Sequence, residues 1–155
     1  MRDKRFVAEH RGGPLKKEQH RQLMIWACAC AEHVLPLLSE TPDKRLLNAL
    51  SVAREWTKGN AAAKDAMKAS VDAHAAARES SGSVSIAVAR AFGQAVATAH
   101  MADHSLGSAL YGLHAVKNAG RSVDQERKWQ DDQLPSEIME LVISARTEKE
   151  QHFRI

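Results

Sequence analysis

The stretch HMADH, from His100 to His104, combines residue types that could bind a metal ion. On a continuous helix, His100 and His104 would share one face, and Asp103 would lie about 60° around the axis from His100. This spacing has the form of the H-x-x-E-H motif of some zinc peptidases, in which two histidines bind the metal. A zinc site would need at least one more ligand, for which His74 and His33 are candidates from other helices.

A structural role for HMADH is the stronger interpretation. Asp103 or Ser105 would make a good helix N-cap, and a helix break at Ala102-Asp103 would separate the two histidines. Aspartate also has a shorter side chain than the glutamate general base of the peptidase motif. We therefore predict no catalytic residue, no cofactor and no metal. If a metal does bind, its expected ligands are His100, Asp103, His104 and His74.

The segments that would position these candidate ligands are all predicted to be helical. Over 16–38, apolar residues recur at the three- and four-residue spacing of an amphipathic helix. Thr41, followed by proline, predicts the N-cap of a second helix that ends at Gly59. Asn60 is the expected cap of a third helix over 61–80, which is rich in alanine.

The second half of the chain continues this pattern. Apolar spacing predicts helices over 84–99 and 106–120, and Ser122 with Gln125 forms a capping box for a shorter sixth helix. A seventh helix is expected after Pro135. The sequence contains no competing alternation of polar and apolar residues that would indicate a strand.

These patterns predict an all-α fold, a single-domain bundle of about six or seven helices over residues 1–155. An extended N-terminal segment, 1–15, would precede a helical bundle over 16–152. The chain has 155 residues, 44% of them hydrophobic, which is enough to bury one core without disulfides or metal.

Small side chains are expected to dominate that core. The third predicted helix carries a stripe of alanines that would let a neighbouring backbone come close, namely Ala62, Ala66, Ala69, Ala73 and Ala76. Cys28 and Cys30 lie about 200° apart around a helix, so they cannot form a disulfide with each other. We expect Cys30 in the core and Cys28 partly buried, in a reducing compartment. Tryptophans are expected as anchors of the core or of helix junctions: Trp26, Trp56 and Trp129.

Charge and hydropathy argue against nucleic-acid and membrane binding. The 22 Lys and Arg and 19 Asp and Glu are mostly interspersed, and the formal net charge is only +3. The basic clusters in 2–5 and 11–17 are explained by a solvated N-terminal segment. No stretch is apolar enough for a membrane span or a signal peptide, so a cytoplasmic location is expected.

Six segments follow in order along nearly the whole chain: RFVAEHRGG (5–13), WACACAEHVLPL (26–37), AREWTKG (53–59), AHAAARES (73–80), AVATAHMADHSLGSALYGL (95–113) and ERKWQDDQLP (126–135). Together they resemble the Imm-5-like family of immunity proteins from bacterial polymorphic toxin systems. The resemblance implies an all-helical domain that binds and neutralises a cognate protein toxin, and it implies no catalytic residue.

Neutralisation would then proceed by occlusion, in which a rigid helical surface covers a part of the toxin that the toxin needs. Exposed residues such as Arg54, Lys58 and Arg121 are candidates for the contact. Two alternatives stay open. One is a metal-dependent helical-bundle hydrolase that uses His100, Asp103 and His104, and the other is a structural protein that forms homo-oligomers through its alanine faces.

Overall fold

Helical residues follow one another along almost the whole chain of the computed structural model, which describes residues 2–155. Seven α-helices are present in this range: α1 (Lys17–Val34), α2 (Lys44–Thr57), α3 (Ala63–Glu79), α4 (Ser83–Ala97), α5 (His104–Asn118), α6 (Val123–Asp132) and α7 (Ser136–Phe153). Three short 3-10 helices are added: η1 (Lys4–Phe6), η2 (Glu9–Arg11) and η3 (Leu35–Leu37). Residues 2–155 contain no strand, only an isolated bridge between Ala8 and Leu15. The predicted all-α class is therefore confirmed.

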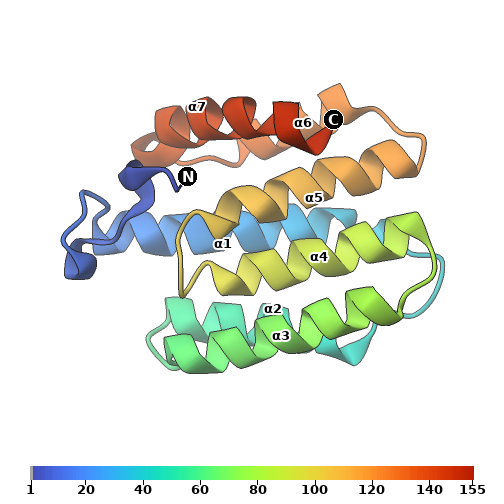
Figure 1. Ribbon diagram of the computed structural model, residues 1–155, viewed down its shortest axis with the longest axis horizontal. Helices are drawn as coiled ribbons and strands as arrows, with labels where there is room; N and C mark the ends of the chain where they lie inside the picture. The colour runs from blue at the N-terminus through green and yellow to red at the C-terminus, as the bar shows by residue number, and fades with distance from the viewer. Residues whose placement is uncertain (1) are drawn as a thin grey trace.

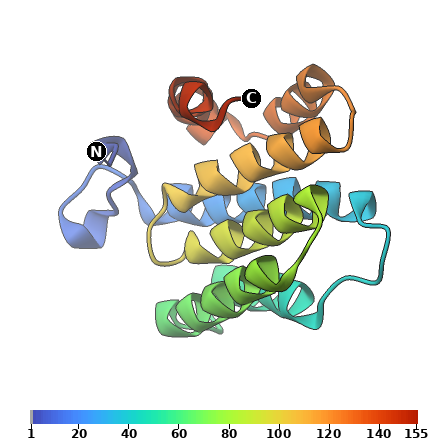
Figure 2. The same cartoon turned by 45° about the vertical axis from the view of Figure 1, so that its right-hand side comes forward.

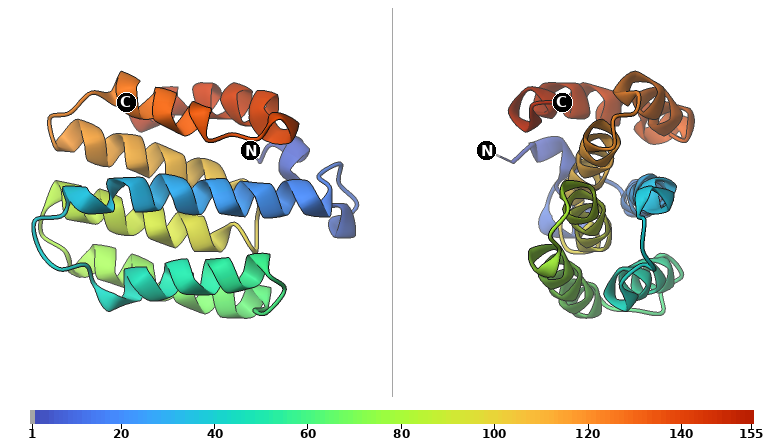
Figure 3. Two further views of the ribbon diagram at one scale, coloured as in Figure 1. Left: turned by 180° about the vertical axis from the view of Figure 1, so that it is seen from behind. Right: turned by 90° about the vertical axis from the view of Figure 1, so that its right-hand side faces the viewer.

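The helices are stacked in three layers (Figure 1). α2 and α3 form one outer layer, α1, α4 and α5 form the middle layer, and α6 and α7 cover the opposite side. The end-on view in Figure 3 shows the middle layer between the two outer ones. Within residues 2–155, no helix is both long enough and apolar enough to cross a membrane.

Two of the predicted N-caps are wrong. The cap of α2 is Asp43, not Thr41, and its carboxylate accepts a backbone N–H of the first turn at 2.9 Å. The cap position of α3 is Ala62, not Asn60, because Asp65 accepts the Ala62 N–H at 2.9 Å and fixes the start there. In both cases a carboxylate closer to the helix satisfies a free N–H group at the helix start.

Other helix ends follow the prediction. Ser122 caps α6, where its hydroxyl accepts the backbone N–H of Gln125 at 3.2 Å. α1 ends before Pro36, which lies in η3. Gly59 has a φ of 82°, a conformation that glycine adopts without steric strain, and it ends the α2 region as expected.

The N-terminal segment is folded onto the helices instead of extended, while its basic residues are exposed, as expected for a solvated segment. It forms η1 and η2 and buries the side chains of Phe6 and Leu15 against the helices. The Leu15 N–H donates to the Val7 carbonyl at 3.0 Å, which closes the segment into a loop. A side chain at Gly13 would collide with that same Val7 carbonyl, so this tight closure requires glycine. Burial of these apolar side chains stabilises the folded segment, while most of the charged residues between them stay exposed.

The interior has two hydrophobic clusters. The first, called the alanine core, lies between α1, α2, α3, α4 and α5, and 15 of its 24 residues are alanine. The second, called the α7 core, joins the N-terminal segment, α1, α5 and α7 and has 12 members: Phe6, Leu15, Leu23, Trp26, Cys30, Ala102, Leu106, Ala109, Leu134, Ile138, Val142 and Ala145.

The two cysteines divide between these clusters. Cys30 is fully buried in the α7 core, as predicted, whereas Cys28 belongs to the alanine core and is only 4% exposed, so the expectation of a partly buried Cys28 is wrong. Burial raises the pKa of the Cys28 thiol to about 12 and that of Cys30 well above its usual range. Both thiols are therefore uncharged at neutral pH and poor nucleophiles.

Candidate functional site

The HMADH stretch lies where α4 gives way to α5, and the predicted helix break is present. α4 ends at Ala97 and α5 begins at His104, so His100 lies in the connection and His104 in the first turn of the next helix. Asp103 stands at the N-cap position, but its carboxylate does not cap the helix. It accepts a hydrogen bond from Arg2 at 2.6 Å instead, and this ion pair ties the N-terminal segment to the connection.

His104 binds to the neighbouring helix. Its Nδ1 lies 2.8 Å from Oε1 of Gln94, and since that oxygen only accepts, Nδ1 is the donor. Burial lowers the pKa of His104. The Gln94 side chain lies across Gly107, where a Cβ would meet its Oε1 at 2.5 Å. The contact therefore joins α4 to α5, and it is possible because Gly107 has no side chain that would displace Gln94.

His74 makes an analogous contact between α3 and α4. Arg90 donates to its Nδ1 at 2.7 Å, and its ring lies directly over Gly93. Burial, and then the charge of Arg90, lowers the pKa of His74 to about 4, so the ring is neutral at pH 7. His33 lies at another place, stacked on Trp129 with ring centroids 3.5 Å apart.

The candidate ligands therefore do not form one metal site. His104, Asp103 and His74 each have a different partner from a different part of the fold. Across residues 2–155, no three His, Cys, Asp or Glu side chains are grouped so that they could hold a metal ion.

A cleft of about 810 Å³, called the end cleft, opens at the same end of the bundle. At this end the N-terminal segment, the α2–α3 turn and the α4–α5 connection come together, as the left side of Figure 1 and the turned view of Figure 2 show. Its lining comes from all of these segments and from the first turn of α1: Ala8, Glu9, His10, Arg11, Lys17, Glu18, His20, Arg21, Trp56, Thr57, Lys58, Gly59, Ala61, Ala63, Ala99 and His100.

The rim of the end cleft carries more positive than negative charge. Its permanent cations are Arg11, Lys17, Arg21 and Lys58. Its two carboxylates are engaged locally: Glu9 accepts a backbone N–H of α1 at 3.1 Å, and Glu18 pairs with Arg21 at 3.1 Å. Lys58 also pairs with Glu55 at 3.6 Å, so within residues 2–155 Arg11 and Lys17 are the rim cations that have no ion-pair partner.

His20 and Trp56 form an aromatic pair in the lining of the end cleft, and this pair is called its floor. His20 is only 6% exposed, and its Nε2 donates to the Thr98 carbonyl at 2.6 Å. Burial lowers the pKa of His20, so the ring is neutral and its Nδ1 is a hydrogen-bond acceptor. The half-buried Trp56 indole lies against this ring, with centroids 4.9 Å apart.

The sequence interpretation missed this site. From the sequence, the basic residues in 11–17 are interpreted as solvated charges and Lys58 as one of several exposed contact residues. Their proximity in the folded protein cannot be predicted from their positions in the sequence. The available signal was His20, which shares the apolar face of the first helix with Leu23 and Ala27 and is therefore buried. Trp56 was expected to anchor the core or a helix junction, and it does pack against the alanine core, but it is half-buried and also lines the end cleft.

The chain matches the family model described as "Imm-5 like putative immunity protein" over residues 13–137. The chain belongs to this family. No curated protein and no solved structure matches it. The matched range runs from Gly13 to the first turn of α7. Most of the residues that line the end cleft of this immunity-family member lie inside the match, whereas its lining residues 8–11 and most of α7 lie outside.

Proposed function

We propose that this immunity-family protein binds a cognate protein toxin and neutralises it by covering a surface that the toxin needs. The observation that carries the proposal is the family match over residues 13–137. Binding needs no reactive group in the protein, and the residues with the best spacing for chemistry are used to join parts of the fold: His104 to Gln94, Asp103 to Arg2, and His74 to Arg90.

The architecture suits occlusion. Seven helices pack through two buried clusters, so the surface is presented by elements that have already lost most of their conformational freedom. A partner that binds such a surface does not have to order it, and this raises affinity for a given contact area. The expected complex is a tight, one-to-one assembly in which the toxin's active surface is sterically blocked.

Growth rescue tests the proposal. Toxin domains encoded beside the gene for this chain are expressed from an inducible promoter in a bacterial host, with and without the chain. We expect the chain to restore growth against one of these domains, and the two purified proteins to form a one-to-one complex by size-exclusion chromatography with light scattering. If no domain is neutralised and none forms a complex, the proposal is wrong.

Metal analysis of the purified protein separates binding from hydrolase chemistry. The proposal predicts that the purified protein still forms its complex with the toxin domain after chelator treatment. About one equivalent of zinc, lost in both His100→Ala and His104→Ala together with a hydrolytic activity, would instead support the metal-dependent hydrolase.

A further inference from the structure

We infer that the end cleft is the toxin-docking surface, and that it receives an acidic segment of the toxin carrying an apolar or aromatic side chain. This inference rests on the proposed function and adds to it the surface and the chemistry of the partner. Three features of the cleft support it: the charge of its rim, the exposed part of Trp56 and the free acceptor of His20.

The rim selects for negative charge. Lys17 and Lys58 both line the cleft and come from different elements, one in the first turn of α1 and the other just after α2. The Lys58 side chain is 64% exposed and lies 3.6 Å from Glu55, a loose surface pair that a better partner can replace. Carboxylates of an incoming segment would be steered to this rim and held in register.

The floor selects for a side chain with apolar surface. Trp56 packs against His20 on one side and faces the cleft on the other. Tryptophan is typical of the residues that carry most of the affinity in protein interfaces, because a large rigid surface is desolvated at small entropic cost. A leucine, phenylalanine or tyrosine of the toxin would fill this position.

His20 adds a directional requirement. Its Nε2–H is taken by the Thr98 carbonyl, while its Nδ1 has no hydrogen-bond partner in the described part of the chain, although the side chain is 6% exposed. This Nδ1 is not among the buried polar atoms that lack a partner in the described residues, so it is open to solvent and free to accept a hydrogen bond. A backbone N–H or a hydroxyl group of the docked segment would satisfy it.

A protein segment fits this cleft better than a single-stranded nucleic acid does. Nucleic-acid sites combine positive charge with aromatic faces open for base stacking. Here Trp56 already packs against His20, and Glu9 and Glu18 stand among the cations, where they would repel a run of phosphates. Carboxylates at a few positions can avoid these two groups, whereas a continuous phosphate backbone cannot.

The test compares two double variants with the same change in charge. The cleft variant is Lys17→Glu with Lys58→Glu, and the control is Lys44→Glu with Arg78→Glu at the opposite end of the bundle. Lys17 and Lys44 are each the first residue of a helix, while Lys58 and Arg78 each lie at a helix end. The pairs are thus matched for exposure and for helix-dipole effects.

The probe is the toxin domain identified by growth rescue. We expect the cleft variant to bind it about 100-fold more weakly or worse, chiefly through a slower association rate, and to lose rescue, while the control changes affinity by less than about threefold. Binding to the natural protein should weaken as salt increases, and the control should keep this dependence. Circular dichroism and the melting temperature establish that both variants are folded.

The outcomes separate the inference from the proposed function. If the natural protein binds the toxin and the folded cleft variant binds it equally well, the end cleft is not the docking surface, but the proposed function stands. If the natural protein binds no toxin domain, both fail. If a short fluorescein-labelled single-stranded DNA binds the end cleft more tightly than the toxin does, the cleft is a nucleic-acid site and the inference is overturned.

Discussion

The alanine core and the α7 core hold their helices together in different ways. In the alanine core, small side chains let the helices approach closely. Its polar contacts are single hydroxyl groups that donate to a backbone carbonyl of a neighbouring helix, such as Ser70 to Gly93 at 2.9 Å and Ser108 to Ala27 at 2.8 Å. In the α7 core only three of the 12 residues are alanine. Its packing depends on larger side chains and on polar groups buried beside them.

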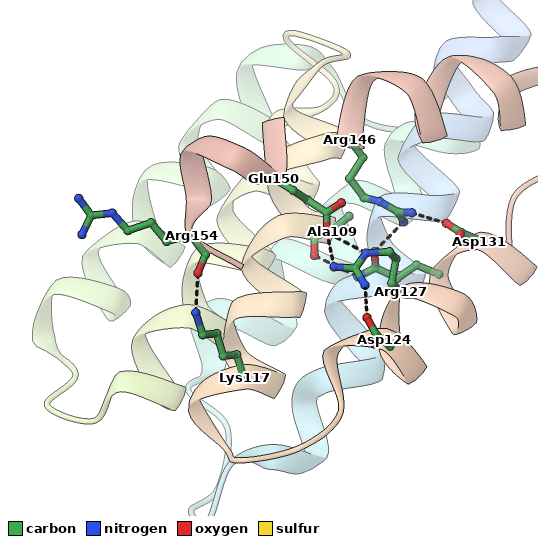
Figure 4. A network of polar contacts seen from close by, with 9 residues as sticks. Ala109, Lys117, Asp124, Arg127, Asp131, Arg146, Glu150 and Arg154 are labelled. Carbon is green, nitrogen blue, oxygen red and sulfur yellow. Dashed lines mark hydrogen bonds and ion pairs between the residues drawn. The ribbon is translucent and has the colours of Figure 1, made fainter. Parts of the chain in front are cut away.

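A chain of polar contacts joins α6 and α7 to the middle layer. Trp26 of α1 donates its indole N–H to the Gln130 carbonyl at 2.8 Å, and the Gln130 amide donates to the Ala109 carbonyl of α5 at 3.0 Å. Arg146 of α7 donates to Gln130 Oε1 at 3.1 Å and pairs with Asp131 (Figure 4). Four helices are therefore connected through directional bonds around one glutamine.

Further contacts along α7 complete this attachment. Arg127 bridges Asp124 and Glu150, and Lys117 donates to the Arg154 carbonyl near the C-terminus (Figure 4). The difference between the two regions is therefore one of specificity. Small side chains fix the distance between helices but tolerate sliding, so the alanine core depends for its register on a few single hydrogen bonds. The connected bonds around Gln130 require one register of four helices at once and penalise every other one.

The largest effect is expected from breaking the buried network. Arg146 is 1% exposed, so Arg146→Ala leaves a cavity and removes a donor from the buried Gln130 side chain. We expect the free energy of unfolding to fall by about 3–5 kcal/mol, measured by urea denaturation. Lys128→Ala, which removes an exposed pair with Asp132, is the control and should leave stability unchanged. Equal stability of the two variants would remove the distinction between the regions.

The alanine core should respond to added volume instead. Ala73 of α3 is fully buried against its neighbours, so Ala73→Leu forces the helices apart and should lower the free energy of unfolding by about 2–3 kcal/mol. Val71→Leu on the exposed side of α3 adds volume without this effect. Tolerance of Ala73→Leu in thermal and chemical denaturation would show that the α3 packing is loose.

Acidification should weaken the contact between α3 and α4 through His74. The pKa of His74 is about 4 in the folded protein and 6.5 for an unperturbed histidine. As the pH falls, this histidine is therefore protonated in the unfolded chain before it is protonated in the folded protein, which favours unfolding. Stability is therefore retained above pH 6.5 and lost progressively down to about pH 4. Since the ring is half-buried and partly screened, we expect a loss of about 1–2 kcal/mol.

Comparison with His74→Gln isolates this contribution. The pKa values of His20 and His104 are lowered as well, and both histidines contribute in the same direction. The measurement is therefore the difference between the two stability curves from pH 7 to pH 4. Parallel curves would mean that His74 does not titrate differently in the folded and unfolded states.

The smallest effect is expected at the glycine below His74. A Cβ at Gly93 would lie 2.6 Å from the imidazole, so Gly93→Ala displaces the ring and its bond to Arg90. The gain in helix propensity offsets part of this, leaving a net loss of about 1 kcal/mol. In a His74→Ala background the same substitution should become stabilising, and a double-mutant cycle by urea denaturation measures the coupling. Additive effects would contradict the contact.

Candidate-site residues were predicted unevenly, for physical reasons. The helix break inside HMADH follows from local signals, and it separates His100 from His104 as expected. The partners of these residues could not be predicted, since Gln94 and Arg2 reach them only after the chain folds back. The end cleft was missed for the same reason, because Lys17 and Lys58 are far apart in sequence and meet at one end of the bundle.

Helix number, helix class and the alanine stripe of α3 were determined by the sequence itself, since spacing, caps and small side chains act over a few residues. Burial of Ala66, Ala69, Ala73 and Ala76 confirms that stripe, while Ala62 lies at the exposed N-cap. Only the tertiary structure decided that Arg146 is buried, that the N-terminal segment folds onto the bundle, and which cations line the end cleft. These depend on desolvation and pairing between distant residues, and such terms are defined only once the helices are packed.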